Sequence, residues 1–397
     1  MTRSITRENE SRQKAKYIIG DIAAAMLSWV VYYLFKIFVL EISPFSFGTK
    51  FFVSLSLYTA GWSFLHYLSG YYNSTFIKSR LNELVTTFAT TLLGCLVLFF
   101  ITVFNDEIEY NEIKISITVL FLLQFSLTYI IRLCQTQRIA HMIHDREIGF
   151  NTLIIGTGRH ARQTAQMLNN LPLSSGYYII GFISYGDDKA EGLQAPVITL
   201  DKDNTLGKIA KENDVKNVII ATEHQDNDLM TLLISELNDT DINIMISPAD
   251  YDQLFIAPYH TTVLYSYPLV SILRSPMPDW QENVKNVADR VASFIALVLL
   301  MPFFLVVAIM IKTGSKGPVI YKQERLGLHA KPFTMYKFRS MYCDDNPEHS
   351  HVLTSNNDPR ITKVGRLLRK NRIDERPQLF NVIIGQMTIV GPRPEQP

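Results

Sequence analysis

Two adjacent carboxylates near the end of the chain, Asp374 and Glu375, are the residues best suited to do chemistry. They lie in the run IDERPQLFNVIIGQM, which begins a helix whose positive N-terminal dipole faces both side chains. One interpretation is an ordinary charge preference at a helix start. The other is a site that holds Mg²⁺ through hard oxygen ligands and directs a carboxylate at phosphorus, with arginines neutralising phosphate charge. The pattern of residues alone favours these two interpretations equally.

The segment around this pair is strongly basic. From Lys312 to Pro397 there are 15 Lys and Arg residues against 8 Asp and Glu residues, whereas the whole chain has a net charge of +1. In ITKVGRLLRKNR the apolar residues fall on one helical face and basic residues flank it, as in a helix at a membrane interface. This segment should attract anionic lipids or phosphorylated molecules, and we expect no nucleic-acid partner.

Composition excludes several classes of protein. The 397 residues suggest two to three domains, and 47% hydrophobic with 19% charged residues excludes a disordered chain. Cys95, Cys134 and Cys343 are too few and too scattered for a disulfide framework or a zinc cluster. His349 and His351 lack further ligands nearby, so a solvated loop is the better interpretation than a metal site.

Four apolar runs, each near the ~20 residues that a helix needs to cross a bilayer, predict a four-helix transmembrane domain over residues 1–140. The runs are Tyr17–Leu40, Phe51–Leu68, Leu84–Phe104 and Ile115–Ile131. Asp21 and Lys36 lie near the ends of the first run and are expected to snorkel toward water. Basic flanks, including Arg132 after the fourth run, place both ends of this domain in the cytoplasm.

Residues 150–248 alternate short β-branched runs with polar helical stretches, which predicts a Rossmann-like α/β domain with a parallel sheet. The first strand leads into GTGRHA, where Gly156 and Gly158 form a glycine turn before a helix. Such a turn can hold a pyrophosphate, or it can simply let the helix pack on the sheet. No acidic residue ends the second strand, since Ser184 follows Ile183, so both interpretations stay open.

Residues 249–284 are rich in proline and aromatic residues, which predicts a connector with a strand or two. An uncharged block, Val291–Ile311, then opens the last domain, residues 285–397, and has basic residues on both sides. Pro302 in its middle removes a backbone hydrogen bond and favours a bend. We therefore predict a re-entrant membrane helix that enters and leaves on the cytoplasmic face, with an ordinary kinked spanning helix as the alternative.

The last domain carries a family resemblance in two long stretches. They are KNVADRVASFIALVLLMPFFLVVAIMIKTGSKGPVIYKQERLGLHAKPFTMYKFRSM and DPRITKVGRLLRKNRIDERPQLFNVIIGQMTIVGPRPE. Both resemble the bacterial sugar transferase family, the polyprenyl-phosphate phosphoglycosyl transferases of the monotopic type. The four helices, the glycine-turn domain and the PLVSILRSP connector resemble the long form of that family, so the resemblance covers nearly the whole chain.

The resemblance implies transfer of a sugar 1-phosphate from a UDP-sugar to undecaprenyl phosphate, with release of UMP and initiation of exopolysaccharide, capsule or O-antigen synthesis. Glucose or galactose is the favoured sugar, with N-acetylated sugars left open, and Mg²⁺ is the implied cofactor. The implied location is the inner membrane of a bacterium, with an α+β catalytic domain that faces the cytoplasm. It leaves open whether the protein forms a homo-oligomer.

The resemblance also implies roles for individual residues. Asp374 would be the nucleophile that forms an aspartyl phosphosugar intermediate, and Glu375 would assist with the metal or with proton transfer. Arg369 and Arg393 match positions that contact substrate phosphates. The matching QERLG and YKFRSM runs would build the site floor or the nucleotide end, through Gln323, Glu324, Arg325, Lys337 and Arg339.

The chain departs from the family pattern in two places. Met301 stands where the family usually has a serine before the membrane proline, Pro302. The sequence also stops at Pro397, before a further family segment with Pro-Gly and Thr-Gly motifs, which predicts a C-terminally incomplete catalytic domain.

Two other functions compete. A membrane-anchored nucleotide-sugar dehydratase would need a Tyr-x-x-x-Lys pair, and Tyr185 and Lys189 lie in a glycine and aspartate turn where a catalytic helix is improbable. A non-catalytic scaffold or regulator of a glycan assembly complex is the second alternative.

Overall fold

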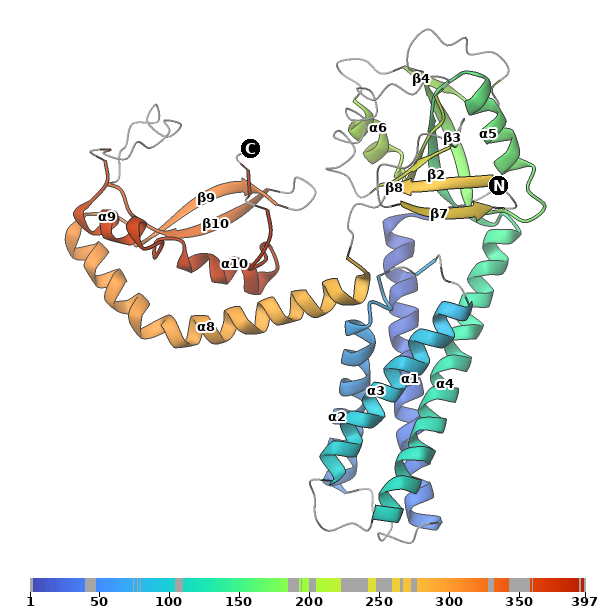
Figure 1. The fold of residues 1–397 in the computed structure, drawn as a ribbon, viewed down its shortest axis with the longest axis horizontal. Coiled ribbons are helices and arrows are strands. Elements are labelled where there is room, and N and C mark those ends of the chain that lie inside the picture. Colours follow the sequence, from blue (N-terminus) through green and yellow to red (C-terminus); the bar gives the residue numbers. More distant parts are fainter. Residues whose placement is uncertain are drawn as a thin grey trace. The chain divides into compact units, whose positions relative to one another are not determined.

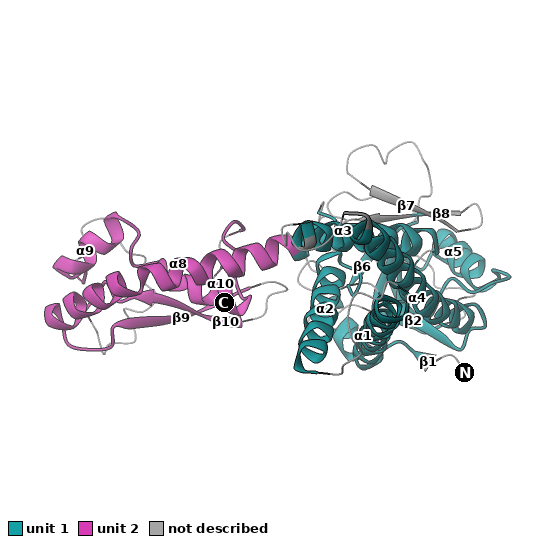
Figure 2. Cartoon of the chain, turned by 90° about the horizontal axis from the view of Figure 1, so that it is seen from below, with its two compact units in different colours: residues 1–283 teal, residues 284–397 magenta. Residues whose placement is uncertain are grey.

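The computed structural model describes most of the chain. The described residues are 3–39, 48–73, 75, 76, 78, 80–103, 110–184, 193, 195–199, 205–222, 242–247, 259–264, 267–272, 277–327, 332–342, 358, 360–392, 394 and 395. The chain forms two compact units, Met1–Asn283 and Val284–Pro397, shown in different colours in Figure 2. Each unit is therefore described by itself.

The first unit begins with long helices that lie side by side (Figure 1). They are α1 (Arg7–Phe38), α2 (Thr49–Leu68), α3 (Arg80–Val103) and α4 (Tyr110–His144). The helices α2 and α4 contain the second and fourth predicted apolar runs, and α1 and α3 contain the first run as far as Phe38 and the third as far as Val103. Among the described helices, α1, α3, α4 and the later α8 are long and apolar enough to cross a membrane, which makes this a membrane protein. The helix α2 does not reach that criterion, so its crossing stays a prediction.

The helices of this bundle pack through aromatic and small residues and leave aliphatic residues outside. Tyr58 and Trp62 of α2 are buried against Cys95 of α3. Gly94 allows this contact, because a Cβ atom there would overlap the Trp62 ring. Large apolar side chains such as Leu57 and Leu93 stay exposed on the outer surface, as lipid contact requires.

The same unit continues with an α/β domain built on one sheet in the order β4-β3-β2-β5-β6-β8-β7, and β1 pairs with β2. The strands are β1 (Arg3–Ser4), β2 (Ile148–Ile155), β3 (Tyr177–Ser184), β4 (Val197–Thr199), β5 (Asn217–Ile220), β6 (Asn243–Ile246), β7 (Tyr259–Leu264) and β8 (Tyr267–Ile272). The strands β4, β3, β2, β5 and β6 pair in parallel, which confirms the predicted α/β class. Helices α5 (Arg159–Asn169) and α6 (Leu206–Glu212) connect them.

The sheet extends past residue 248, where the sequence predicted a separate connector. Strand β8 pairs antiparallel with β6, and β7 pairs antiparallel with β8. The α/β domain therefore includes these two strands, and its first long strand starts at Ile148. The predicted turn around Tyr185 and Lys189 lies outside the described residues.

The sheet has a buried apolar layer on each face. Leu153 and Ile155 point to one layer, and Ile154 between them points to the other. Because both faces are covered, the end of β2 is an uninterrupted hydrophobic run, Leu153 to Ile155. Gly156 follows with a φ of +117°, and a Cβ atom there would overlap the carbonyl of Ala221. The first glycine of the turn is thus required by the packing of neighbouring strand ends.

The second unit combines a long helix with a small α+β layer. Its elements are α8 (Asp279–Gly314), which starts in the first unit, β9 (Ile320–Leu326), β10 (Pro332–Phe338), α9 (Lys363–Lys370), the 3₁₀ helix η4 (Arg376–Gln378) and α10 (Leu379–Ile384). Pro302 lies inside α8, which stays one helix and bends along its length (Figure 1). A re-entrant path for this helix stays a prediction. Val307 and Ile311 of α8 form the core with Phe338 and Leu368.

Candidate active site around Asp374 and Glu375

Asp374 lies in the short turn between α9 and η4, beside the end of β10. The α9 helix starts at the N-cap Thr362, whose hydroxyl accepts a hydrogen bond from the Gly365 amide at 2.8 Å. The helix ends where Arg372 takes a φ of +52° and reverses the chain. The backbone carbonyl of Asp374 then accepts a hydrogen bond from the Phe338 amide at 2.8 Å. The turn is thus fixed to the strand.

The carboxyl of Asp374 is half-buried in a charged environment. Burial, and next the negative charge of Glu375, raise the pKa of Asp374 above its ordinary value, while the positive charges of Lys337 and Arg369 oppose that rise. A carboxylate with a raised pKa is a stronger nucleophile once it has lost its proton. The site therefore brings a basic carboxylate together with cations that can balance an anionic substrate.

Glu375 is oriented by two basic side chains. Its carboxylate lies 3.5 Å from Nζ of Lys337 and 3.9 Å from Nη1 of Arg372. The first contact crosses from the turn to β10, so the predicted pair Glu375 and Lys337 does meet in space. The contact with Arg372 is local and solvent-exposed, and we give it little energetic weight.

Arg369 on α9 reaches the same region. Its Nε donates a hydrogen bond to Oγ of Ser340 at 2.8 Å, and its charge acts on the Asp374 carboxyl. Arg393, the other predicted phosphate ligand, lies outside the described residues.

The β9–β10 hairpin divides the predicted floor residues between two faces. Met335 pairs with Gln323 and Lys337 with Tyr321, so Gln323 and Lys337 share a face of the pleated hairpin. Arg325 belongs to that face too, and its Nη2 donates to Oε1 of Gln323 at 3.1 Å. Glu324 lies on the opposite face and is exposed. Glu324 thus lies on the other face of the hairpin from Gln323, Arg325 and Lys337.

Arg339 is buried and belongs to the packing of α8. Its Nη1 donates to the Lys316 carbonyl at 3.0 Å, and its Nη2 donates to both the carbonyl and the hydroxyl of Ser315 at 2.8 Å. These acceptors lie just beyond the C-terminal end of α8, where carbonyl groups lack helical partners. Arg339, predicted to build the site floor or the nucleotide end, thus holds the residues that follow α8. A contact between Arg339 and substrate stays a prediction.

Two residues that the sequence interpretation missed support this arrangement. Ser340 holds Arg369, as described above. Asn381 of α10 is fully buried, accepts a hydrogen bond from the Tyr336 amide at 3.1 Å and donates to the Thr334 carbonyl at 2.7 Å. A polar residue inside the apolar run LFNVII was the available signal for Asn381.

The acidic pair provides a partial ligand set for a divalent cation. Among the described residues there is no group of three or more His, Cys, Asp and Glu side chains that could hold a metal. Asp374 and Glu375 supply two carboxylates, and Mg²⁺ is commonly held by one or two carboxylates together with substrate phosphates and water. The residues present therefore fit Mg²⁺ that arrives with a phosphorylated substrate.

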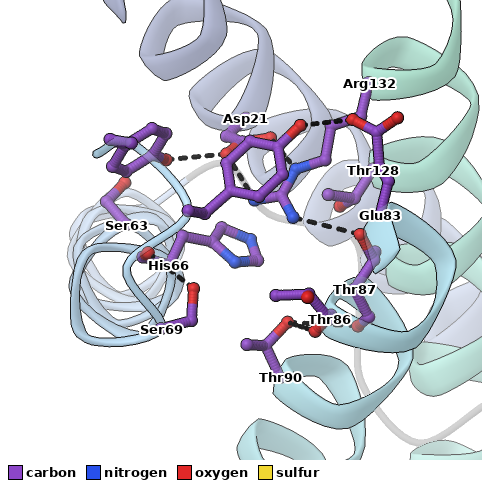
Figure 3. A network of polar contacts seen from close by, with 12 residues as sticks. Asp21, Ser63, His66, Ser69, Glu83, Thr86, Thr87, Thr90, Thr128 and Arg132 are labelled. Carbon is purple, nitrogen blue, oxygen red and sulfur yellow. Dashed lines mark hydrogen bonds and ion pairs between the residues drawn. The ribbon is translucent and has the colours of Figure 1, made fainter. Parts of the chain in front are cut away.

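A second polar cluster lies inside the helix bundle and corrects the expected snorkelling of Asp21. Both oxygens of Asp21 accept hydrogen bonds from Arg132, at 2.8 Å from Nε and 2.6 Å from Nη2, and both side chains are buried (Figure 3). Nη1 of Arg132 donates to Thr87 at 3.0 Å, and the Tyr72 hydroxyl donates to Asp21 at 2.6 Å. Arg132 is thus an internal partner of Asp21 and cannot count as a surface charge that sets topology.

Glu83 extends this cluster from α3. It accepts hydrogen bonds from the hydroxyls of Tyr71 and Thr136, the latter at 2.9 Å, and Thr136 is 2.9 Å from the Tyr17 hydroxyl. The cluster joins α1, α3, α4 and the α2–α3 loop. Its role is to fix the packing of the bundle.

The glycine turn of the α/β domain leads directly into α5. Gly158 is the N-cap of that helix, and a ring nitrogen of His160 lies 2.8 Å from the Ser247 carbonyl at the end of β6. This contact ties the start of α5 to a neighbouring strand. Nucleotide binding at this turn stays a prediction.

Comparison with known proteins gives two family matches. Residues 280–397 match the family described as bacterial sugar transferase, and residues 67–248 match one described as a CoA-binding domain. The first match contains the whole acidic-pair site.

Individual relatives are similar over parts of the chain. A UDP-glucose:undecaprenyl-phosphate glucose-1-phosphate transferase from Klebsiella pneumoniae is 36% identical over 202 residues, which are 49% of this chain and 43% of that protein. An undecaprenyl-phosphate galactose phosphotransferase from Salmonella typhimurium is 30% identical over 260 residues, 61% of this chain and 53% of that protein. An undecaprenyl-phosphate glucose phosphotransferase from Komagataeibacter xylinus is 43% identical over 131 residues, 33% of this chain and 25% of that protein. The chain thus spans about half or less of these relatives.

Proposed function

Since the chain belongs to the bacterial sugar transferase family, we propose that it transfers a sugar 1-phosphate from a UDP-sugar to undecaprenyl phosphate and releases UMP. The observation that carries this proposal is the meeting of Asp374 and Glu375 with Lys337 and Arg369 at the end of β10. Relatives named for glucose and galactose transfer support these sugars, and relatives named for N-acetylgalactosamine transfer keep an N-acetylated sugar as the alternative. The product would start a surface polysaccharide such as exopolysaccharide, capsule or O-antigen.

The proposed reaction has two displacements at one phosphorus atom. The Asp374 carboxylate attacks the phosphorus that carries the sugar, a P–O bond forms, and the bond to UMP breaks so that UMP leaves. An oxygen of undecaprenyl phosphate then attacks the same phosphorus and releases the Asp374 carboxylate. The lipid leaves as a diphosphate-linked sugar, and the enzyme is regenerated.

Nearby residues neutralise and orient the substrate. Arg369 and, from its motif position, Arg393 bind phosphate oxygens, since a guanidinium offers paired donors to phosphate. Lys337 orients Glu375 and balances charge near Asp374. Mg²⁺ held between Asp374, Glu375 and the diphosphate would supply further charge neutralisation. Gln323 and Arg325 line the same hairpin face as Lys337 and are candidates for nucleotide contact.

We further propose that the protein resides in the bacterial inner membrane with its second unit on the cytoplasmic side. The basic flanks of the apolar helices support this orientation. UDP-sugars are made in the cytoplasm, so the proposed donor would reach the site directly.

The proposal predicts that Asp374→Asn abolishes turnover, because an amide cannot act as the attacking carboxylate. Membranes that contain the full chain would be assayed for UMP release from a panel of UDP-sugars with undecaprenyl phosphate and Mg²⁺. We expect release with at least one UDP-sugar and a loss of at least about 10³-fold in the variant. A matched variant, Asp289→Asn in α8, should keep activity within a few fold. Unchanged release by Asp374→Asn would contradict the enzyme mechanism and favour a scaffold role.

A further inference from the structure

The end of β10 contacts both the proposed nucleophile and the proposed phosphate-binding arginine. The Phe338 amide donates to the Asp374 carbonyl at 2.8 Å. Two residues later, Oγ of Ser340 accepts a hydrogen bond from Nε of Arg369 at 2.8 Å. One short backbone segment therefore fixes the relative position of Asp374 and Arg369.

Ser340 is itself held firmly. It is 8% exposed, and its carbonyl accepts a hydrogen bond from the Thr362 amide at 3.1 Å. A Cβ atom on Gly365 would overlap that carbonyl, so the first turn of α9 rests directly on Ser340. The preceding residue, Arg339, is anchored to the end of α8. The hydroxyl of Ser340 therefore projects from a fixed backbone.

The hydrogen bond that Arg369 donates to Ser340 uses only the Nε–H group of the guanidinium. Within the described part of the chain, the side chain of Arg369 has this one hydrogen bond and no ion pair. A guanidinium has five N–H donors, and Nε carries one of them. Among the residues that the structure describes, the four donors on the two terminal nitrogens have no hydrogen-bond partner, and such donors suit a bidentate contact with phosphate.

We propose that Ser340 is a positioning residue that orients the guanidinium of Arg369 so that its terminal nitrogens bind the diphosphate of the nucleotide sugar. This role rests on the proposed function of the same site. In this role the serine of the KFRSM run acts on the substrate through Arg369 and not by direct contact. It also separates Ser340 from Arg339, which anchors α8.

A double-mutant cycle on the full chain tests this role. UMP release from the UDP-sugar that the wild type uses best would give kcat and KM for Ser340→Ala, Arg369→Ala and the double variant. We expect Ser340→Ala to raise KM about tenfold with a smaller change in kcat, as for loss of a hydrogen bond to a charged group. In the Arg369→Ala background, removal of the Ser340 hydroxyl should have no further effect, because it acts through that arginine.

Two more variants separate positioning from packing. Ser315→Ala removes a comparable serine–arginine hydrogen bond, the one to Arg339, and should leave KM unchanged. Ser340→Thr keeps the hydroxyl and should bring KM back to within about threefold of the wild type. Should Ser340→Ala fail to fold, Ser340→Cys keeps the side-chain size but offers only a weak acceptor, and it should still raise KM.

The outcomes distinguish this role from the proposed function. An active wild type with additive effects of Ser340→Ala and Arg369→Ala, or a Ser340→Cys variant with wild-type KM, would overturn the role of Ser340 alone. A wild-type chain that releases no UMP from any UDP-sugar would overturn the proposed function and this role with it.

Discussion

At the scale of single residues, identical side chains serve different purposes that only their neighbours reveal. Asp374 and Glu375 could be identified from the sequence because they lie in a run that resembles the bacterial sugar transferase family, whereas their charge pattern alone left a helix-start preference equally open. Motif position assigned Arg369 to substrate phosphate and Arg339 to the site floor, but it could not show what either side chain contacts. One binds carbonyl groups beyond α8 and the other approaches Asp374. Ser340 gave no signal, because a serine becomes informative only once its partner across the fold is known.

The raised pKa of Asp374 makes a prediction about pH. The nucleophile must be deprotonated, so activity should fall as the pH drops through the pKa of Asp374. Lys337 holds that pKa down, so Lys337→Met should raise it and move the acid limb of kcat/KM to higher pH. The pH profile of UMP release measures this shift.

The control for this experiment is Lys322→Met, which removes the same charge from the opposite face of the hairpin. Its acid limb should coincide with that of the wild type. An acid limb of Lys337→Met that stays in place or moves to lower pH would rule out the electrostatic role of Lys337.

At the scale of elements, hydrophobic pattern predicted the helices and the parallel strands but missed the antiparallel end of the sheet. The four apolar runs lie in α1 to α4, and β-branched runs lie in β2, β3, β5 and β6. The sequence predicted a strand or two in residues 249–284 but not their place in the sheet, and Pro268 lies within β8. The ladder with β6 covers only Val270 to Ile272, so the missing N–H of Pro268 breaks no hydrogen bond with β6.

The buried pair of Asp21 and Arg132 also escaped the sequence, because its members lie 111 residues apart. We predict that Arg132→Met destabilises the bundle by about 3–5 kcal/mol, since it leaves the Asp21 carboxylate buried without a partner. The double variant Asp21→Leu with Arg132→Met should recover most of that loss. Thermal unfolding of the full chain in detergent measures both.

Arg138→Met on the exposed side of α4 is the matched control and should change stability by less than about 0.5 kcal/mol. Equal midpoints for Arg132→Met and Arg138→Met would show that the buried pair does not stabilise the bundle.

At the scale of the whole molecule, the chain combines two compact units, and its proposed chemistry lies in the second. Residues 284–397 contain the acidic pair, the hairpin and the long bent helix α8. The structure divides the chain at Val284, and the sequence interpretation placed the start of its last domain at residue 285. The motifs support the proposed reaction class, whereas the sugar cannot be derived from them, since the roles proposed for the described site residues concern phosphate, the nucleotide or one another.

The most direct test of the central claim is detection of the covalent intermediate on Asp374. The full chain, purified in detergent with Mg²⁺, would be mixed with its UDP-sugar in the absence of undecaprenyl phosphate, and the protein and UMP would be measured together. The mechanism predicts a burst of about one UMP per chain, a mass gain equal to one sugar phosphate on the peptide that contains Asp374, and loss of both in Asp374→Asn. Subsequent addition of undecaprenyl phosphate should remove the added mass. The contradicting result would be turnover when undecaprenyl phosphate is present, combined with neither a UMP burst nor a mass gain when it is absent. Transfer would then occur directly from donor to lipid, with no covalent intermediate on Asp374.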